Sequence, residues 1–152
     1  MLRELVANPG PNPVTELAER LGADGVHIAA DADLYARARG LLGESANIGV
    51  GCPPDRDAAM RLAELGADYV AFAPEGTGAA AMDRCAELIA WWSEVLVVPC
   101  VAWNVDDPVQ AAQFAALGAD FVAPSTEIWQ HDHAAQLIGD IDSVIGRARS
   151  AA

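Results

Sequence analysis

The sequence predicts an α/β fold with a parallel sheet, an incomplete TIM (β/α)8-type barrel of about six β/α units. Leu-Gly-Ala-Asp occurs three times, at 21–24, 65–68 and 117–120, each time between an alanine-rich helical stretch and a short apolar run. This alternation continues along the chain and is typical of parallel strands joined by right-handed crossovers. A complete barrel needs about 200 residues or more, whereas the chain has 152. The competing architecture is an open doubly wound sheet, which the absence of GxGxxG and GxxxxGK[ST] disfavours.

The expected strands are short apolar runs. Three of them directly follow the repeat, and a continuous apolar run suits a parallel strand that is buried on both faces. In chain order we expect strands at 5–7, 25–28, 47–51, 69–72, 96–102 and 121–124.

The expected helices precede or follow these strands, at 14–21, 33–42, 57–65, 82–93, 108–117 and 133–148. The glycine of each repeat supplies the left-handed conformation that ends a helix. Aspartates lie just ahead of three helices as N-cap candidates, and Pro108 fits a first helical position. The candidates are Asp31 or Asp33, Asp55, and Asp106 or Asp107.

Composition limits the class of protein. With 53% hydrophobic residues, the chain is expected to fold as a single domain over 1–152. Its net charge is −13, with 22 acidic residues against 9 basic ones, and it contains no lysine. This balance argues against a nucleic-acid or anionic-membrane partner. No apolar run is long enough to span a membrane and no secretion signal is evident, so we expect a cytoplasmic protein with three free cysteines.

Three segments resemble the thiamine phosphate synthase (thiamine-phosphate pyrophosphorylase) and thiazole tautomerase family, in a divergent proteobacterial branch. They are LGADGVHI at 21–28, IGVGCPPDRDAAMRLAELGADYVAFAP at 48–74, and the stretch from VPCVAWNVDDP to ALGADFVAPSTEIW at 98–129. The resemblance implies that 5–8 is the third barrel strand and 121–124 the eighth, so the first two β/α units have no counterpart. Such a sheet has an open edge, which predicts a homodimer or association with the missing portion.

The resemblance also implies a site. The family joins an aminopyrimidine diphosphate to a thiazole phosphate, and Mg²⁺ screens the leaving diphosphate. Asn8 matches the family's pyrimidine contact. Asp31 or Asp33 is the candidate metal ligand, although in gapless register Ala32 takes the metal position; the alternative is that both cap the next helix.

The remaining implied contacts are phosphate contacts. Thr77 and Gly78 stand in a loop where the family has Thr-Gly-Thr-Lys, and the alternative is an ordinary glycine-rich turn. Gly51 replaces a serine that contacts the diphosphate. Trp103-Asn104-Val105 stands at the family's Gly-Gly, where Val tolerates positive φ poorly. Thr126 replaces a serine that contacts the thiazole phosphate.

Two residues are candidates on their own chemistry. Trp103 ends a strand, where barrel sites are built, and its ring could stack on a flat heterocycle. His27 lies within a strand, which suits a core or barrel-lumen histidine, with proton transfer as the alternative.

Three functions follow. The first is a thiamine phosphate synthase-like protein that binds a phosphorylated thiazole or aminopyrimidine with lost or weakened catalysis and no cofactor, because most phosphate and metal contacts are replaced. The second is an active synthase with Mg²⁺, completed by dimerisation or by a missing N-terminal segment. The third is a thiazole tautomerase-like isomerase that uses His27 or an aspartate.

Overall fold

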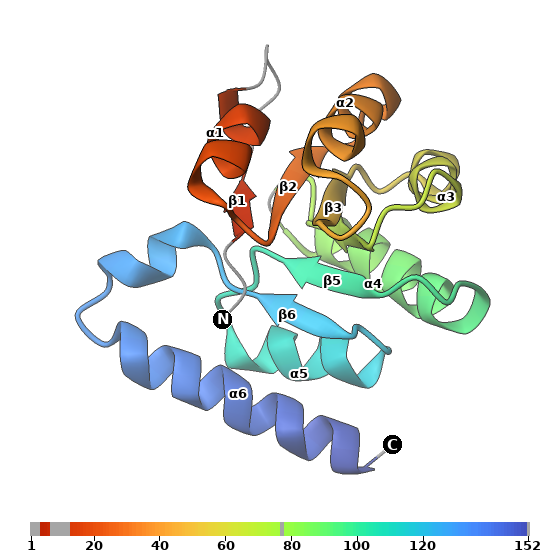
Figure 1. Ribbon diagram of the computed structural model, residues 1–152. Helices are drawn as coiled ribbons and strands as arrows, with labels where there is room; N and C mark the ends of the chain where they lie inside the picture. The colour runs from red at the N-terminus through yellow and green to blue at the C-terminus, as the bar shows by residue number, and fades with distance from the viewer. Residues whose placement is uncertain (1–3, 7–12, 77, 152) are drawn as a thin grey trace. The chain divides into compact units, whose positions relative to one another are not determined.

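The computed structural model describes residues 4–6, 13–76 and 78–151. The chain divides into two compact units, Met1–Ala71 and Phe72–Ala152, and each is described by itself. Strands and helices alternate in both units, as the sequence predicts (Figure 1).

The first unit contains three β/α pairs and most of a fourth strand. Its elements are β1 (Glu4–Val6), α1 (Pro13–Leu21), β2 (Gly25–Ala29), α2 (Ala32–Leu42), β3 (Asn47–Cys52), α3 (Arg56–Glu64) and β4 (Tyr69–Phe72), which reaches the boundary. The strands β1, β2 and β3 pair in parallel, and β4 is the neighbour of β3. Four aliphatic side chains of β2 and β3 have no exposed surface and form the core: Val26, Ile28, Ile48 and Val50.

The second unit continues the pattern. Its elements are α4 (Ala79–Val95), β5 (Cys100–Trp103), α5 (Pro108–Ala116), β6 (Phe121–Ala123), the short 3-10 helix η1 (Thr126–Gln130) and α6 (Ala134–Ala151). Strands β5 and β6 pair in parallel, and α6 lies along α5 (Figure 1). Trp92 of α4 is fully buried, and its ring meets Phe72 edge-on at 5.5 Å between centroids.

The repeated Leu-Gly-Ala-Asp is a helix end joined to a strand start. Gly22, Gly66 and Gly118 all have positive φ, at 61°, 99° and 99°. In each copy the glycine N–H and the following alanine N–H bond back to helix carbonyls, for example Gly66 to Ala63 and Ala67 to Leu62. This is the Schellman pattern, which satisfies the last carbonyls of a helix, so the predicted left-handed cap is confirmed.

The aspartate of the repeat fastens the new strand to its neighbour. Asp68 exchanges two hydrogen bonds with Ile48 of β3: its carboxylate accepts the Ile48 N–H at 2.7 Å and its own N–H donates to the Ile48 carbonyl. Asp120 makes the same pair of bonds with Cys100 of β5, the first at 2.8 Å. The repeat is therefore a structural device at the amino ends of the strands.

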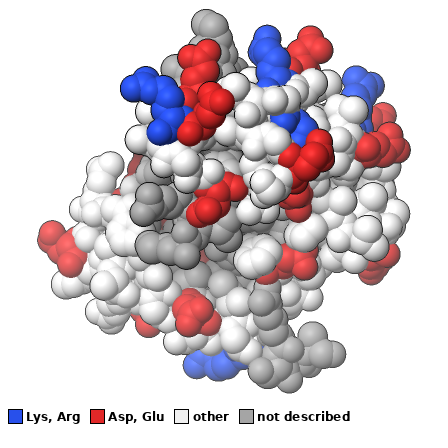
Figure 2. Space-filling view, viewed as in Figure 1, with Lys and Arg blue, Asp and Glu red and all other residues white. Residues whose placement is uncertain are grey.

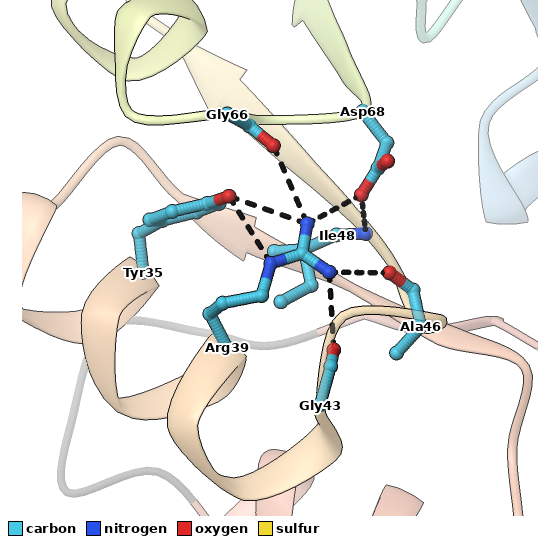
Figure 3. A network of polar contacts seen from close by, with 7 residues as sticks. All are labelled: Tyr35, Arg39, Gly43, Ala46, Ile48, Gly66 and Asp68. Atoms are coloured by element: carbon cyan, nitrogen blue, oxygen red, sulfur yellow. Dashed lines mark hydrogen bonds and ion pairs between the residues drawn. The ribbon is translucent and has the colours of Figure 1, made fainter.

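Arg39 reinforces this end of the first unit (Figure 3). Its guanidinium donates to the Tyr35 hydroxyl, to the Asp68 carboxylate at 2.7 Å, and to three backbone carbonyls. Those carbonyls belong to Gly43, Ala46 and Gly66. A planar group with five donors thus ties α2 to the turns that precede β3 and β4.

Several predicted boundaries shift. The strand expected at 96–102 is wrong in its first part. Leu96 ends α4, because its N–H donates a hydrogen bond to the Trp92 carbonyl. The Trp92 indole N–H donates a hydrogen bond to the Val98 carbonyl at 2.7 Å. The chain becomes a strand only at Cys100. Helix α4 also begins before the expected residue 82, and η1 was not predicted.

The cap alternatives resolve in favour of three aspartates. Asp31 caps α2, Asp55 caps α3 and Asp107 caps α5, each accepting backbone N–H bonds from the first turn. Pro108 occupies the first turn of α5, as expected. Asp33 and Asp106 are therefore free of capping roles.

Two further expectations concern surface and thiols. Figure 2 shows carboxylates spread over the face that it draws, with guanidinium groups among them, in line with the net charge of −13. The three cysteines are unpaired, as predicted, and all three are buried. Burial raises the pKa of the Cys52 thiol to about 12 and of Cys85 and Cys100 to about 11, so these thiols stay protonated at neutral pH. In the described part of the chain, no helix combines the length and apolarity needed to cross a membrane.

Candidate functional site

In the second unit, the loops that follow β5 and β6 begin side by side. Trp103 and Ala123 are register partners at the carboxyl ends of the two strands. One residue further along the β5 loop, the Val105 N–H donates to the Ala123 carbonyl at 3.2 Å. Parallel strands place their carboxyl-end loops at one edge of a sheet, where α/β proteins bind ligands. The structure therefore brings together the two loops that carry the predicted residues Trp103, Asn104 and Thr126.

Trp103 and Cys100 lie on opposite faces of β5. Cys100 is fully buried, and burial raises the pKa of its thiol. Successive strand side chains point to opposite faces, and these two residues are three positions apart. The Trp103 side chain is half-buried. This position suits the predicted stacking role, which remains a prediction.

Asn104 corrects an expectation about the β5 loop. The resemblance implies a glycine-like backbone at Trp103-Asn104-Val105, and Val105 would tolerate positive φ poorly. Instead Asn104 has φ of 60° and is the one non-glycine residue with positive φ among those described. Asn tolerates this conformation better than most residues, and Val105 is simply buried. The loop therefore adopts a left-handed turn without glycine.

A polar link that the sequence did not reveal joins the two loops. The Asp106 carboxylate accepts the Ser125 N–H at 2.7 Å and the Ser125 hydroxyl at 2.5 Å. Asp106 entered the sequence argument only as a possible helix cap, because nothing in a lone Asp or Ser indicates that they meet across 19 residues. Thr126, next to Ser125, is exposed and begins η1.

The loop that precedes α4 contains the predicted Thr77 and Gly78. Thr77 lies outside the described residues. Gly78 is the N-cap of α4, with φ of 101° and no side-chain cap. A Cβ built there would meet nothing within 4 Å, so the space around the backbone is open. This geometry leaves its role in phosphate binding a prediction.

In the first unit, the two predicted metal ligands follow β2. Asp31 accepts the Leu34 N–H at 2.7 Å as the helix cap, which confirms the capping alternative for this residue. Asp33 lies in the first turn of α2 and is exposed. No group of three or more His, Cys, Asp or Glu residues able to hold a metal occurs within the described ranges. Mg²⁺ held by one or two carboxylates and by substrate phosphates needs no such group, and the metal-binding role of these two carboxylates stays a prediction. The other residue predicted at a strand end, Asn8, lies outside the described residues.

His27 is buried within the first unit, in agreement with the predicted core or lumen position. It is 6% exposed, its Nδ1 lies 3.0 Å from the Tyr69 hydroxyl, and the two rings stack at 5.7 Å between centroids. Burial lowers the pKa of His27 to about 4, so the ring is neutral near pH 7.

Two glycines of β3 make room for this pair. A Cβ at Gly51 would lie 2.9 Å from the His27 Nε2, and a Cβ at Gly49 would overlap the Tyr69 ring. The absence of serine at position 51 thus has a local steric reason, since any side chain there would displace His27.

Parallel β/α pairs with polar loops at the carboxyl ends of the strands define an α/β protein of the kind that binds small ligands at that edge. Residues 12–128 match the family described as thiamine monophosphate synthase. The chain is 40% identical over 123 residues to the thiamine-phosphate synthase of Rhodospirillum centenum and 42% identical over 130 residues to that of Erythrobacter litoralis. The chain belongs to the thiamine monophosphate synthase family.

These alignments cover 79% and 82% of this chain but only 59% and 61% of the two relatives, so it spans about three-fifths of their length. Among solved structures, thiamine phosphate pyrophosphorylase from Pyrococcus furiosus superposes with a TM-score of 0.77 at 16% identity, covering 97% of this chain and 68% of that one. Dihydrodipicolinate synthase from Thermotoga maritima superposes at 0.68 with 18% identity, covering 99% of this chain and 62% of that one. At these identities the superpositions show a shared fold.

Proposed function

We propose that this chain is the greater part of an active thiamine-phosphate synthase and supplies units three to eight of one barrel domain. The reaction forms a bond between the pyrimidine methylene carbon and the thiazole nitrogen, while the carbon–oxygen bond to diphosphate breaks and pyrophosphate leaves with the electron pair. The observation that carries the proposal is that the loops after β5 and β6, which contain Trp103, Asn104 and Thr126, begin side by side, in a chain whose residues 12–128 match the family.

Each of these residues has a role in the proposal. Trp103 stacks on a heterocycle, the left-handed turn at Asn104 turns backbone groups toward the ligand, and Thr126 offers a hydroxyl to the thiazole phosphate. Gly78, Thr77 and Asn8 are proposed as diphosphate and pyrimidine contacts. Preorganised donors of this kind stabilise developing charge because they need no rearrangement during the reaction.

Asp31 and Asp33 are the proposed Mg²⁺ ligands. Mg²⁺ would neutralise the leaving diphosphate. The Asp31 oxygen that caps α2 also fixes the carboxylate's orientation, which leaves its other oxygen for a cation.

A second candidate is a protein that binds phosphorylated thiazole or aminopyrimidine without turnover. The absence of lysine from the chain favours it, because the matching loop of the family carries one. The left-handed turn at Asn104 argues against this second candidate. The loop lacks the family's Gly-Gly, but Asn104 keeps a glycine-like backbone conformation there.

One experiment separates the candidates. The purified full chain is mixed with the aminopyrimidine diphosphate, thiazole phosphate and Mg²⁺, and pyrophosphate release is followed beside calorimetry with thiazole phosphate alone. Release of pyrophosphate supports the synthase, and heat without release supports the binder. Neither signal at millimolar ligand would reject both.

The proposed metal ligands are tested against a control variant that removes the N-cap aspartate of another helix. The Asp31→Ala, Asp33→Ala double variant should lose activity by about 10²-fold or more if it removes charge stabilisation of the leaving group. Asp55→Ala removes a cap of the same type from α3 and should cost stability but little activity. Equal losses in both variants would assign Asp31 to capping alone.

A second copy of the chain is the proposed partner. In the second unit, one edge of β6 pairs with β5. The other edge of β6 has no partner strand among the residues described in that unit, and Phe121 of β6 is 62% exposed. Exposed edges favour pairing with another chain. Light scattering on the purified chain should give the mass of a dimer, and a monomer at all concentrations would contradict the proposal.

A further inference from the structure

We propose that Asp106 is a positioning residue that holds the loop after β6 so that Thr126, rather than Ser125, meets the substrate phosphate. The inference rests on the proposed function and deepens it. Asp106 belongs to the loop after β5, and its partner belongs to the loop after β6, so its carboxylate joins the two loops that carry the candidate site.

Capping does not account for Asp106. The cap of α5 is its neighbour Asp107, whose carboxylate accepts the Val109 and Gln110 N–H groups at 2.6 and 3.1 Å. Asp106 is half-buried and directs both carboxylate oxygens to Ser125, at 2.7 Å to the N–H and 2.5 Å to the hydroxyl. Charge-assisted bonds at these distances are among the stronger hydrogen bonds in proteins.

The contacts of Ser125 show which hydroxyl remains for a ligand. Ser125 donates its hydroxyl and its N–H to Asp106, and its Oγ accepts the Glu127 N–H at 3.2 Å. Both donors are therefore consumed within the protein. Thr126 stands between these two residues and is exposed, so the contacts of its neighbours fix the backbone on either side of it.

The Asp106 carboxylate would lie near the negative charge of a substrate phosphate, and its hydrogen bonds reduce the resulting repulsion. A bare carboxylate beside a phosphate would repel it, but both oxygens of the Asp106 carboxylate accept short hydrogen bonds from Ser125, which offset part of its negative charge. The carboxylate orders the loop in the free protein, so that binding does not have to order it.

The test compares neighbouring aspartates. Asp106→Asn places an amide N–H₂ where Ser125 needs an acceptor, while Asp107→Asn exchanges one good cap for another. Calorimetry of the full chain with thiazole phosphate should show a dissociation constant raised about tenfold or more for Asp106→Asn, since small misplacements of binding groups are costly. Asp107→Asn should bind like the unmodified chain.

Serine variants provide the second arm. Ser125→Ala should weaken binding as much as Asp106→Asn does, and combining these two changes should weaken it no further. Ser125→Thr retains both donors and should bind thiazole phosphate like the unmodified chain. Thr126→Val should abolish the same heat without altering the loop. Hydrogen exchange at the Ser125 and Glu127 amides should accelerate in Asp106→Asn and not in Thr126→Val.

The outcomes are distinct. Unchanged affinity in Asp106→Asn, with or without faster exchange, overturns the positioning role but leaves the proposed function standing. Full affinity in Thr126→Val with loss in Ser125→Thr overturns the assignment of the hydroxyl. Absence of both heat and pyrophosphate release from the unmodified chain rejects the proposed function, and unchanged exchange in Asp106→Asn then rejects the loop contact as well.

Discussion

Asn104 shows how a single side chain can stand in for glycine. Its φ of 60° lies in the left-handed region, which costs most L-residues about 1–2 kcal/mol but is less costly for Asn. The side chain is exposed, so substitutions there act mainly through the backbone.

Replacing Asn104 therefore tests the conformation directly. Asn104→Gly should leave the free energy of unfolding unchanged or slightly higher, whereas Asn104→Ala should lower it by about 1 kcal/mol. Urea denaturation followed by circular dichroism measures both values. A fully tolerated alanine would mean that the loop takes another conformation in solution.

His27 is a buried imidazole whose burial disfavours its charged form. Its pKa falls to about 4, below the ordinary value of about 6.5. The unfolded chain therefore binds more protons than the folded chain between these pH values, so this residue makes stability rise with pH across that window.

The expected result is a loss of about 2 kcal/mol from His27 on moving from pH 7 to pH 5, from the two pKa values by linkage. The difference in unfolding free energy between the unmodified chain and His27→Gln should shrink by this amount over the same interval. Urea denaturation at the two pH values supplies the comparison. A constant difference would show that the histidine is charged or solvated in the folded state.

At the scale of elements, the repeat links the helix that ends to the strand that begins. Its glycine closes the helix and its aspartate fastens the next strand to the preceding one. Asp120 and Cys100 illustrate the link, because the Cys100 N–H has a carboxylate partner at 2.8 Å and Cys100 itself is fully buried.

Asp120→Ala should therefore destabilise the chain by about 1–3 kcal/mol, the usual cost of leaving a buried donor unsatisfied. Asp83→Ala, an exposed carboxylate on α4, removes the same charge and should cost less than about 0.5 kcal/mol. Thermal unfolding of the two variants gives the comparison. Equal effects would mean that the charge, and not the hydrogen bond, matters.

At the scale of the whole molecule, the net negative charge affects the stability of the folded state. A net charge of −13 on 152 residues produces self-repulsion that disfavours the compact state and that salt screens. Raising NaCl from about 20 mM to about 500 mM should raise the melting temperature by several degrees, because the screening length shortens severalfold. A variant with several exposed carboxylates changed to amides should respond less. A melting temperature that falls with salt would indicate that attractive ion pairs prevail.

The sequence predicted most of the elements but little of the site's geometry. Local signals were enough for the repeat glycines, the helix caps and the alternation of strand and helix, since each depends on residues a few positions apart. The contacts of Trp92 with Val98 and of Asp106 with Ser125 have no such local signal. The first contact accompanies a later start of β5 than predicted, and the second joins the loops after β5 and β6.

By itself, the sequence determined the α/β class, the family resemblance and the charge, because periodicity, motifs and composition can be read without coordinates. Only the tertiary structure decided which residue takes the left-handed turn after β5, which aspartate caps α5 and which links two loops. The physical reason is that hydrogen bonds between side chains distant in the chain depend on strand register and loop path, and these follow from packing of the whole unit.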